Sequence, residues 1–433
     1  MEELNRLSRF VLDEAKTMGA DYAQCVVSES EKKVFNVDGG EFSLMRTLFD
    51  RDVVITLLKD QRKGTVHVNR FEEAAIRGAI ADCLEACAGA ESDPAWQFAD
   101  EPSETAYTDG SPSCDTDLLF SRTEELLHMI RERHPKILLE QMITEHDAER
   151  SLYRNSNGVC CRTESGSYRF SLMYSGHEGE KSTSFFSSDV TLKTLDRPVI
   201  ETALFERELS AIENQLDPSP LQGKFVGTVL LAPSALLEIV LSTVIGKFVS
   251  DSSLIDGSSI WKDKLGQSVA DPRFSLRFAP NADEVVDRTH LTGEGYPAED
   301  YDLIRDGRLV SFALSQYGAN KTGGKRAGNN SWNMFVPAGE KSLEEIIRCI
   351  DRGVLVMRFS GGDPASSGEF SGVAKNSFLI ENGRVSNALT ETMISGCIPD
   401  MLNHIREISS DRLLDGFLGL PYIAFDGLTV SGK

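Results

Sequence analysis

Apolar residues at the start of the chain recur at helical spacing and then give way to short stretches of the kind that form strands. The first pattern predicts a helix that ends near Gly19, a residue suited to the position after a helix. Segments rich in Val, Phe, Leu and Thr follow, separated by turn residues such as Asp38-Gly39-Gly40. Asn69 and Glu72 resemble a capping box, which predicts a second helix over 71–88. The strands between these helices are expected at 22–27, 33–37, 41–49, 53–58 and 65–68.

A change of composition after this first unit predicts a linker. Residues 90–113 are acidic, contain three prolines and show no sustained periodicity. A helix is then expected over 115–132, because Pro135 disfavours helical geometry in the residue before it. Asn155-Ser156-Asn157-Gly158 is typical of a hairpin turn, since Asn and Gly tolerate positive φ. The other elements expected in this second unit are strands at 137–145, 149–153, 159–163, 168–175 and 182–186, and a helix over 196–209.

The prolines of Asp217-Pro218-Ser219-Pro220 end the second unit, and the remainder is expected to form one large domain. Arg305-Asp306-Gly307 and Glu381-Asn382-Gly383 predict tight antiparallel hairpins there. The remaining expected elements are strands at 225–231, 354–359, 377–381 and 384–388, and helices from about 234, over 342–352 and over 399–408.

The clustering of the strands predicts an α+β fold, because the strands do not alternate regularly with helices. We expect N-terminal α/β-meander units followed by a large mixed, β-rich C-terminal domain. The expected division is an N-terminal domain over 1–92, a linker over 93–113, a central domain over 114–217 and a C-terminal domain over 221–433.

Charge and composition narrow the partners of the chain. It has 433 residues and a formal net charge of -22, and its densest basic stretch, at 321–326, is short. Nucleic-acid binders neutralise phosphates with clustered Lys and Arg, so we expect no nucleic-acid partner. The most apolar region, 225–249, is interrupted by Pro233, Glu238 and Lys247, so no membrane span is expected. The N-terminal residues do not resemble a secretory signal, and the chain is expected to be cytoplasmic.

A search for catalytic motifs finds no active site. No two of the seven histidines lie three, four or five residues apart, as a zinc helix requires. His177-Glu178 begins like a zinc motif but continues without a second His, and a loop histidine is favoured. Glu145-His146-Asp147 offers acid–base groups, but strand alternation sends His146 to the opposite face from its neighbours, and a solvated strand end is favoured. Packing is favoured over catalysis for Cys397, and the glycine-rich 361–368 lacks the lysine of a phosphate loop.

The eight cysteines favour reduced thiols over a metal or redox role. Cys83 and Cys87 lie four apart on an expected helix, Cys160 and Cys161 are adjacent, and no CxxC pair occurs.

The order of several short motifs resembles the TldD/PmbA family, whose members are also labelled candidate modulators of DNA gyrase. The resemblance covers nearly the whole chain. Each motif is weak alone, but their order and spacing are distinctive. The matching segments are Gly19 to Ala23, Val37 to Glu41, Asn155 to Gly158, Glu294-Gly295, Asn333 to Gly339, Gly368 to Ser371, Ile380 to Gly383 and Glu391 to Gly396.

The resemblance implies a PmbA (TldE)-like subunit. TldD-type chains carry HExxxH on the helix after the first strand of the last domain, and a Cys near the C-terminus completes their zinc site. Here the corresponding helix, 233–243, contains no His, and no Cys follows Cys397. The resemblance therefore implies no catalytic, cofactor-binding or metal-binding residue in this chain, with zinc expected in a TldD-like partner. That partner would be a zinc peptidase acting on unfolded or modified peptides, and this chain would supply part of the groove.

Two alternatives remain open from the sequence. The first is an active homodimeric metallopeptidase with atypical ligands drawn from residues such as Glu238, His290 and Cys397. The second is a non-enzymatic modulator of DNA gyrase, for which the acidic charge permits contact with protein. Leu237 and Leu241 are expected to be core residues of the amphipathic helix, so that mutating them should weaken folding without altering any intrinsic metal content.

Overall fold

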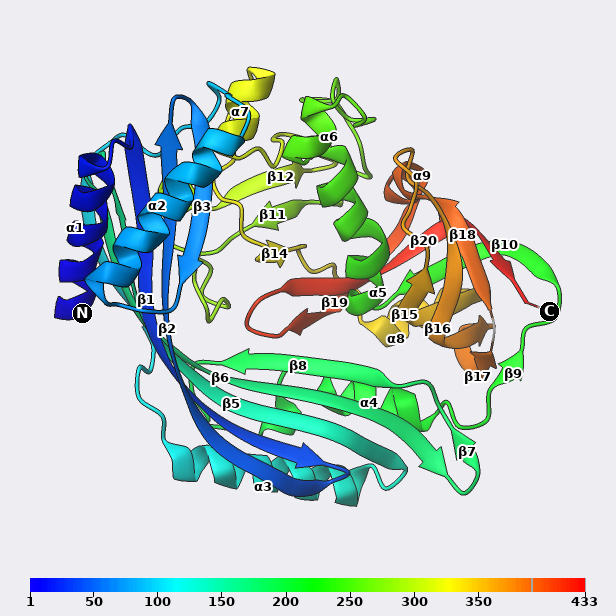
Figure 1. Cartoon of the computed structure of the whole chain (residues 1–433). Coiled ribbons are helices and arrows are strands. Elements are labelled where there is room, and N and C mark those ends of the chain that lie inside the picture. The colour runs from blue at the N-terminus through cyan, green and yellow to red at the C-terminus, as the bar shows by residue number, and fades with distance from the viewer. Residues whose placement is uncertain (391, 433) are drawn as a thin grey trace.

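A computed structural model describes residues 1–390 and 392–432 of the chain. Two β-sheets organise the molecule, a strongly curved sheet from the first half and a mixed sheet from the second (Figure 1). The fold is α+β and rich in strand, as the clustering of strands predicts.

The first sheet consists of long strands that sweep across the molecule. Its order is β3-β2-β1-β5-β6-β4, and β7 and β8 also pair with β6. Neighbouring strands are antiparallel except for β4, which runs parallel to β6. Its strands are β1 (Tyr22–Asp38), β2 (Glu41–Lys59), β3 (Arg62–Val68), β4 (Ser103–Gly110), β5 (Ile137–Asn155), β6 (Val159–Glu178), β7 (Lys181–Ser182) and β8 (Phe186–Leu192).

The sequence predicts more and shorter strands than the structure contains, and it assigns the residues of β4 to a linker. The breaks predicted inside β1, β2, β5 and β6 do not occur, because the residues at these positions stay paired with the neighbouring strands. The predicted linker over 93–113 contains β4, which extends the first sheet. The predicted capping box at Asn69 and Glu72 is also wrong, because Glu72 itself precedes the helix and makes no side-chain cap.

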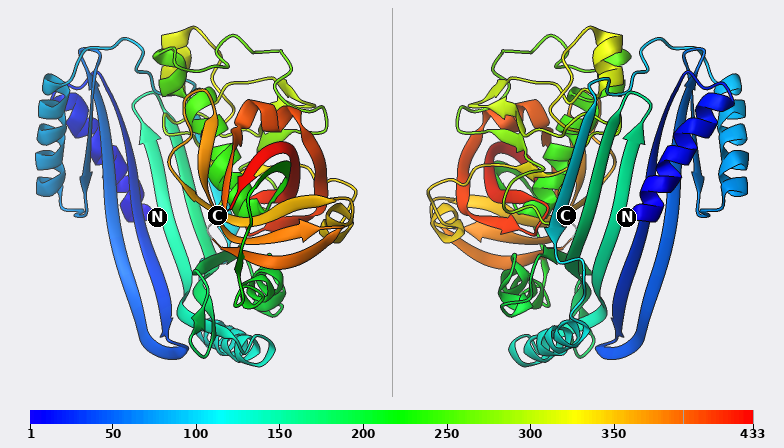
Figure 2. Two further views of the ribbon diagram at one scale, coloured as in Figure 1. Left: turned by 90° about the vertical axis from the view of Figure 1, so that its right-hand side faces the viewer. Right: turned by 90° about the vertical axis from the view of Figure 1, so that its left-hand side faces the viewer.

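Two helices cover one end of the first sheet. α1 (Glu2–Thr17) and α2 (Glu73–Gly89) bury apolar side chains such as Leu7 and Ile80 against Val27 and Ile55 of the strands. Figure 2 shows both helices on the side of the sheet that faces away from the C-terminal domain. The opposite face of this part of the sheet is therefore available to the C-terminal domain.

A second group of helices packs on the lower part of the same sheet. α3 (Thr116–Arg133) begins after Asp115, whose carboxylate accepts a hydrogen bond from Leu118 N at 3.0 Å. η1 (Val199–Glu201) and α4 (Phe205–Glu213) follow β8. Their apolar residues form a core shared with the C-terminal domain, which includes Phe170 of β6, Leu209 of α4 and Tyr422.

The second sheet is built mainly by the last half of the chain. Its order is β13-β12-β11-β14-β20-β10-β15-β16-β17-β9, with β18 bridging β16 and β20 and with β19 beside β20. Its strands are β9 (Ser219–Pro220), β10 (Lys224–Leu231), β11 (Leu276–Phe278), β12 (Tyr301–Arg305), β13 (Arg308–Leu309), β14 (Met334–Phe335), β15 (Arg352–Gly361), β16 (Glu369–Glu381), β17 (Arg384–Thr390), β18 (Met393–Cys397), β19 (Ile405–Leu414) and β20 (Gly419–Ser431).

Pairing in this sheet closes a ring of strands. β10 pairs with β15, β15 with β16, β16 with β18, β18 with β20, and β20 with β10. The largest apolar cluster lies in this part of the chain and includes Val229, Val356 and Phe425. Its helical elements are α5 (Pro233–Leu236), η2 (Leu237–Leu241), η3 (Val244–Phe248), α6 (Asp251–Ile255), α7 (Gln316–Thr322), α8 (Leu343–Arg348) and α9 (Ile398–Asn403).

The turn predictions in this domain are confirmed. Asp306 and Gly307 join β12 to β13, and Asn382 and Gly383 join β16 to β17, all with positive φ. The helix predicted over 399–408 ends early, because Ile405 begins β19. Within the described residues, no helix combines the length and the apolar character that crossing a bilayer requires.

Candidate functional site

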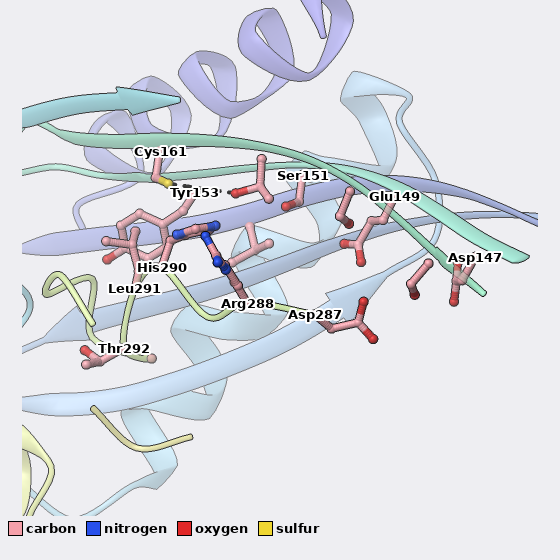
Figure 3. Close-up of a pocket in the computed structure, with 15 residues that line it drawn as sticks. Asp147, Glu149, Ser151, Tyr153, Cys161, Asp287, Arg288, His290, Leu291 and Thr292 are labelled. Atoms are coloured by element: carbon pink, nitrogen blue, oxygen red, sulfur yellow. Dashed lines mark hydrogen bonds between the residues drawn. The ribbon is translucent and has the colours of Figure 1, made fainter. Parts of the chain in front are cut away.

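A cleft of about 520 Å³ lies between the first sheet and a loop of the C-terminal domain. The sheet contributes alternate residues of two paired strands, because successive side chains of a strand point to opposite faces. Figure 3 shows Asp147, Glu149 and Ser151 in a row along β5. The residues of this wall are Val26 of β1, Asp147, Glu149, Ser151 and Tyr153 of β5, and Cys161, Thr163, Ser165 and Ser167 of β6.

The other wall is the loop 287–293, which direct contacts attach to the sheet. Gln24 Nε2 of β1 donates to Gly293 O at 2.9 Å, and just beyond the loop Ala99 N, in the segment before β4, donates to Glu294 O at 2.8 Å. Gly295 has a φ of +88°, and a Cβ built on it would lie 2.1 Å from Tyr153 Oη. Only glycine therefore fits this approach, which explains the Glu294-Gly295 step noted in the sequence.

Carboxylates dominate the charge of the cleft. Loss of hydration raises the pKa of Glu149, and the neighbouring carboxylates of Asp147 and Asp287 raise it further. Loss of hydration likewise raises the pKa of Asp287. Asp147 forms an ion pair with Lys32 at 2.8 Å. Three carboxylates, several hydroxyl groups and one guanidinium, that of Arg288, line this cleft. Because the carboxylates outnumber the guanidinium, its chemistry suits hydrogen-bond donors and cationic groups.

His290 lies at one end of the cleft and is held by two neighbours. Its Nε2 lies 2.5 Å from a carboxylate oxygen of Asp109, and its ring stacks on Tyr107 with centroids 3.7 Å apart. Both partners belong to β4, within the segment that we expected to be a linker. This contact therefore joins the C-terminal loop to the first sheet.

The expectations for Glu145-His146-Asp147 are confirmed in part. His146 does face away from its neighbours, as strand alternation predicts, and it is buried with Nε2 2.9 Å from Ser111 O. The prediction of a solvated strand end is wrong, because β5 runs unbroken through these residues. Asp147 faces the cleft as the first of the alternate polar residues Asp147, Glu149 and Ser151. The sequence contains this period-two pattern, but the strand break that we predicted between residues 145 and 149 divides it.

The other motifs considered in the sequence lie apart from the cleft. His177 is exposed near the end of β6, and residues 362–368 form the glycine-rich bend between β15 and β16. Cys397 ends β18, where burial raises the pKa of its thiol.

The cysteines are free thiols in the described part of the chain, and five of the eight are buried. Cys83 and Cys87 lie on the buried face of α2, and burial raises the pKa of Cys83 to about 11. Cys160 and Cys161 point to opposite faces of β6, one toward α1 and one into the cleft. Burial does not explain why every thiol is free, because three of them are partly or fully exposed: Cys114, Cys349 and Cys397.

The helical stretch after β10 is the place where the resemblance locates a zinc motif in TldD-type chains. Two π-helical segments, η2 and η3, follow the single α-turn of α5. Glu238 is the sole carboxylate, histidine or cysteine between residues 233 and 248. Its Oε2 accepts a hydrogen bond from Phe359 N at 2.7 Å. Desolvation raises the pKa of Glu238, while this hydrogen bond and nearby Arg358 lower it.

The atypical ligands considered above are Glu238, His290 and Cys397, and each contacts a different part of the chain. Glu238 bonds to β15, His290 to β4, and Cys397 Sγ lies 3.9 Å from Ser367 O. Across residues 1–390 and 392–432, no three His, Cys, Asp or Glu side chains are grouped as a metal site would need.

The family-like motifs occupy positions that the backbone constrains. Asn155 is buried, and its Oδ1 accepts hydrogen bonds from Asn157 N and Val159 N, each at 3.0 Å. A Cβ on Gly339 would lie 1.9 Å from Ile408 O, so this motif also depends on close backbone approach. Glu391, the first residue of the last motif, lies outside the described residues.

Comparisons with known proteins agree with these motifs. Residues 223–432 match the family model described as PmbA/TldA metallopeptidase C-terminal domain. A metalloprotease PmbA homolog from Haemophilus influenzae is 22% identical over 460 residues, which cover 100% of this chain and 97% of that protein.

Solved structures share the fold. TldE from Thermococcus kodakarensis superimposes with a TM-score of 0.83 at 21% identity, covering 99% of this chain and 100% of that one. A candidate modulator of DNA gyrase from Bacteroides thetaiotaomicron gives a TM-score of 0.82 at 21% identity, with complete coverage of both chains. The matched C-terminal domain, 223–432, and the similarity of the full-length curated relative support membership of this chain in the TldD/PmbA family.

Proposed function

We propose that this chain is a PmbA/TldE-like subunit that supports peptide cleavage by a TldD-like zinc peptidase and holds no catalytic metal itself. The partner would supply the ion that activates water and polarises the scissile carbonyl. This chain would supply part of the wall along which the peptide lies.

The proposal rests on the side chains of the helix after β10, which include a single group that could bind a metal. Zinc sites in proteins use imidazole, thiolate and carboxylate ligands, usually three or four together. Residues 233–248 offer Glu238 alone, and its carboxylate already accepts a hydrogen bond from Phe359 N. The side chains around it are leucine, isoleucine and valine, which cannot bind a metal. These residues therefore do not fit a zinc ion.

The cleft described above supports a role in binding peptides. It lies between two parts of the chain, as ligand sites often do, and it presents hydroxyl and carboxylate acceptors along an extended strand face. An extended peptide could direct its N–H groups and basic side chains at Ser151, Glu149 and Asp287. We therefore expect peptides with basic side chains to bind better than acidic ones.

A reconstitution experiment tests the proposal. The chain and a TldD-type chain are purified separately, and cleavage of an unfolded peptide is measured for each alone and for the mixture. We expect no cleavage by this chain alone, and faster cleavage by the mixture than by the TldD-type chain. Glu238→Gln should leave the rate of the mixture within about twofold. Zinc-dependent cleavage by this chain alone, abolished by Glu238→Gln, would support the homodimeric metallopeptidase and contradict the proposal.

A further inference from the structure

A second cavity, of about 530 Å³, lies where the first sheet meets the C-terminal sheet. One side consists of residues 182–184, which precede β8, together with Gln215 and Pro218. The other side consists of residues 373–376 of β16 and of neighbouring residues of β17 and β18, namely Leu389, Thr390 and Met393. Among these lining residues, Lys375 alone carries a charge, and none of them lines the cleft described above.

Two cationic side chains lie directly opposite each other beside this cavity. Arg358 of β15 pairs with Lys375 of β16 in the antiparallel ladder. Side chains paired in this way lie on the same face of a sheet, with their Cβ atoms about 4.5–5.5 Å apart. Arg358 Nη1 donates to Phe185 O at 3.0 Å, and Phe185 follows the lining residue Ser184. Both cations therefore face the segment that precedes β8.

No carboxylate among the described residues balances this pair at close range. Neither Arg358 nor Lys375 has an Asp or Glu oxygen within 4.0 Å of its side-chain nitrogens in residues 1–390 and 392–432. Glu238 is near Arg358, but its Oε2 accepts a hydrogen bond from a backbone N–H of β15. Asp217, next to the lining, pairs with Lys181. Because like charges directly opposite each other destabilise a sheet, the two cations favour an anionic ligand.

The rest of the lining supplies hydroxyl groups and apolar contacts. Ser182 and Thr390 carry hydroxyls that can donate to an anion. Met393 is 44% exposed, and the other apolar side chains of the lining include Pro218, Val373 and Leu389. Ligand sites commonly combine an apolar wall with a few polar groups that fix the orientation of the ligand. The cavity therefore suits a ligand that joins a negative group to an apolar one.

We propose that this cavity binds a carboxylate attached to an apolar group, with the carboxylate between Arg358 and Lys375. A guanidinium has five N–H donors in a planar fork that matches the two oxygens of a carboxylate, and the bond to Phe185 O uses only one of them. The C-terminal residue of a peptide carries this combination when its side chain is apolar, and so does an acidic side chain with an apolar neighbour. The inference concerns this chain alone and does not depend on the proposed partner.

Ligand-observed NMR titrations of the full chain test the proposal and separate these two sources. N-acetylleucine represents a C-terminal residue, and N-acetylaspartic acid α-amide represents an acidic side chain. We expect saturable binding of at least one of them, weakened by added NaCl because salt screens partly exposed charges. N-acetylleucinamide, which lacks the charge, and inorganic phosphate, which lacks the apolar group, should each bind at least about tenfold more weakly than the preferred carboxylate.

Matched variants connect binding to the two cations. Lys375→Gln and Arg358→Gln should each weaken the preferred carboxylate at least about tenfold, and Arg358→Lys should stay within about threefold of the native chain. Lys262→Gln is the control, because Lys262 is exposed in the loop after α6 and does not line the cavity, and it should change binding less than twofold. Without ligand, Lys375→Gln should unfold at no lower urea concentration than the native chain, because it removes the repulsion from Arg358.

A further variant concerns Glu391, which follows the lining residue Thr390 and lies outside the described residues. Glu391→Gln should bind the preferred carboxylate within about threefold of the native chain. Binding that appears only in Glu391→Gln would mean that a carboxylate of the chain itself occupies the site, and it would overturn the proposal. Absence of saturable binding to the native chain, equal binding of phosphate, or unchanged binding to Lys375→Gln would overturn it as well.

Discussion

A single buried residue, Glu208, makes the stability of this chain depend on pH. Glu208 of α4 is buried, and the hydroxyl of Ser188 donates to its carboxylate at 2.5 Å. Burial raises the pKa of Glu208 to about 7, and the nearby carboxylates of Asp415 and Asp189 add to the effect. Tyr174, whose hydroxyl lies 2.8 Å from Ser188 Oγ, completes the group and stays neutral in this range.

The sign of the pH dependence follows from this raised pKa. Between about pH 4.5 and 7 the folded chain holds a proton on Glu208 that the unfolded chain has released, so stability falls as pH rises. The loss approaches about 3 kcal/mol above pH 7, since one pKa unit corresponds to about 1.4 kcal/mol. Glu208→Gln should remove this component in urea unfolding curves measured from pH 5 to 8. The exposed Glu124→Gln is the control, and an equal pH slope in both variants would contradict the assignment.

A second prediction concerns Gly295, where the loop that lines the cleft comes close to Tyr153 of β5. Gly295→Ala should lower the free energy of unfolding by more than backbone strain alone, because its Cβ would overlap Tyr153. Gly266→Ala is a matched control, since Gly266 has a φ of +78° and open space around it, so strain of about 1–2 kcal/mol is expected there. Equal losses for the two variants in chemical denaturation would show that the contact with Tyr153 is unimportant.

At the scale of elements, the helix after β10 shows where periodicity succeeds and fails. The sequence predicts both Leu237 and Leu241 as core residues, but only Leu241 is fully buried, and Leu237 packs at the edge of the core. A helical wheel misassigns the stretch because η2 and η3 are π-helical, so residues progress around the axis more slowly than in an α-helix.

This difference predicts unequal effects of two similar substitutions. Leu241→Ala should cost about 2–5 kcal/mol, as expected for a large-to-small change in a packed core. Leu237→Ala should cost clearly less, because part of its side chain already contacts water. Thermal and urea unfolding of both variants measure the difference. A loss for Leu237→Ala as large as that for Leu241→Ala would contradict the burial described here.

The outer edge of β2 gives a prediction about association with the proposed partner. Residues 41–52 pair with β1 on one side, and none of the described strands pairs with them on the other. Met45 and Phe49 in this edge are 61% and 76% exposed. An exposed apolar edge strand is a surface on which another chain can pair, and we expect the TldD-type subunit to use it.

Charged substitutions test this edge. Met45→Lys combined with Phe49→Lys should weaken binding to the TldD-type chain at least about tenfold, measured by sedimentation of the mixture. Val385→Lys, at an apolar residue of β17 that is 43% exposed, should leave binding within about twofold. Unchanged association of the double variant would exclude the β2 edge as the contact.

At the scale of the whole molecule, local signals predicted the fold class and the tight turns but not the way that the sheets join. The turns at Asn155 to Gly158 and Asn382-Gly383 are encoded by residues that tolerate positive φ, so the sequence was sufficient there. The placement of β4 was not predictable locally, because its parallel partner β6 lies about fifty residues further along the chain. The cleft depends on such distant contacts, and for this reason Glu149 could not be recognised as one of its residues from the sequence.

Measuring the zinc content of the separately purified chain shows whether it holds a metal of its own. The chain and its complex with a TldD-type subunit are each exposed to excess zinc, freed of loosely held metal by gel filtration, and analysed by atomic emission. We expect far less than one zinc per chain for the isolated chain and about one per pair for the complex. One tightly held zinc per chain in the isolated protein, lost in Glu238→Gln, would contradict it.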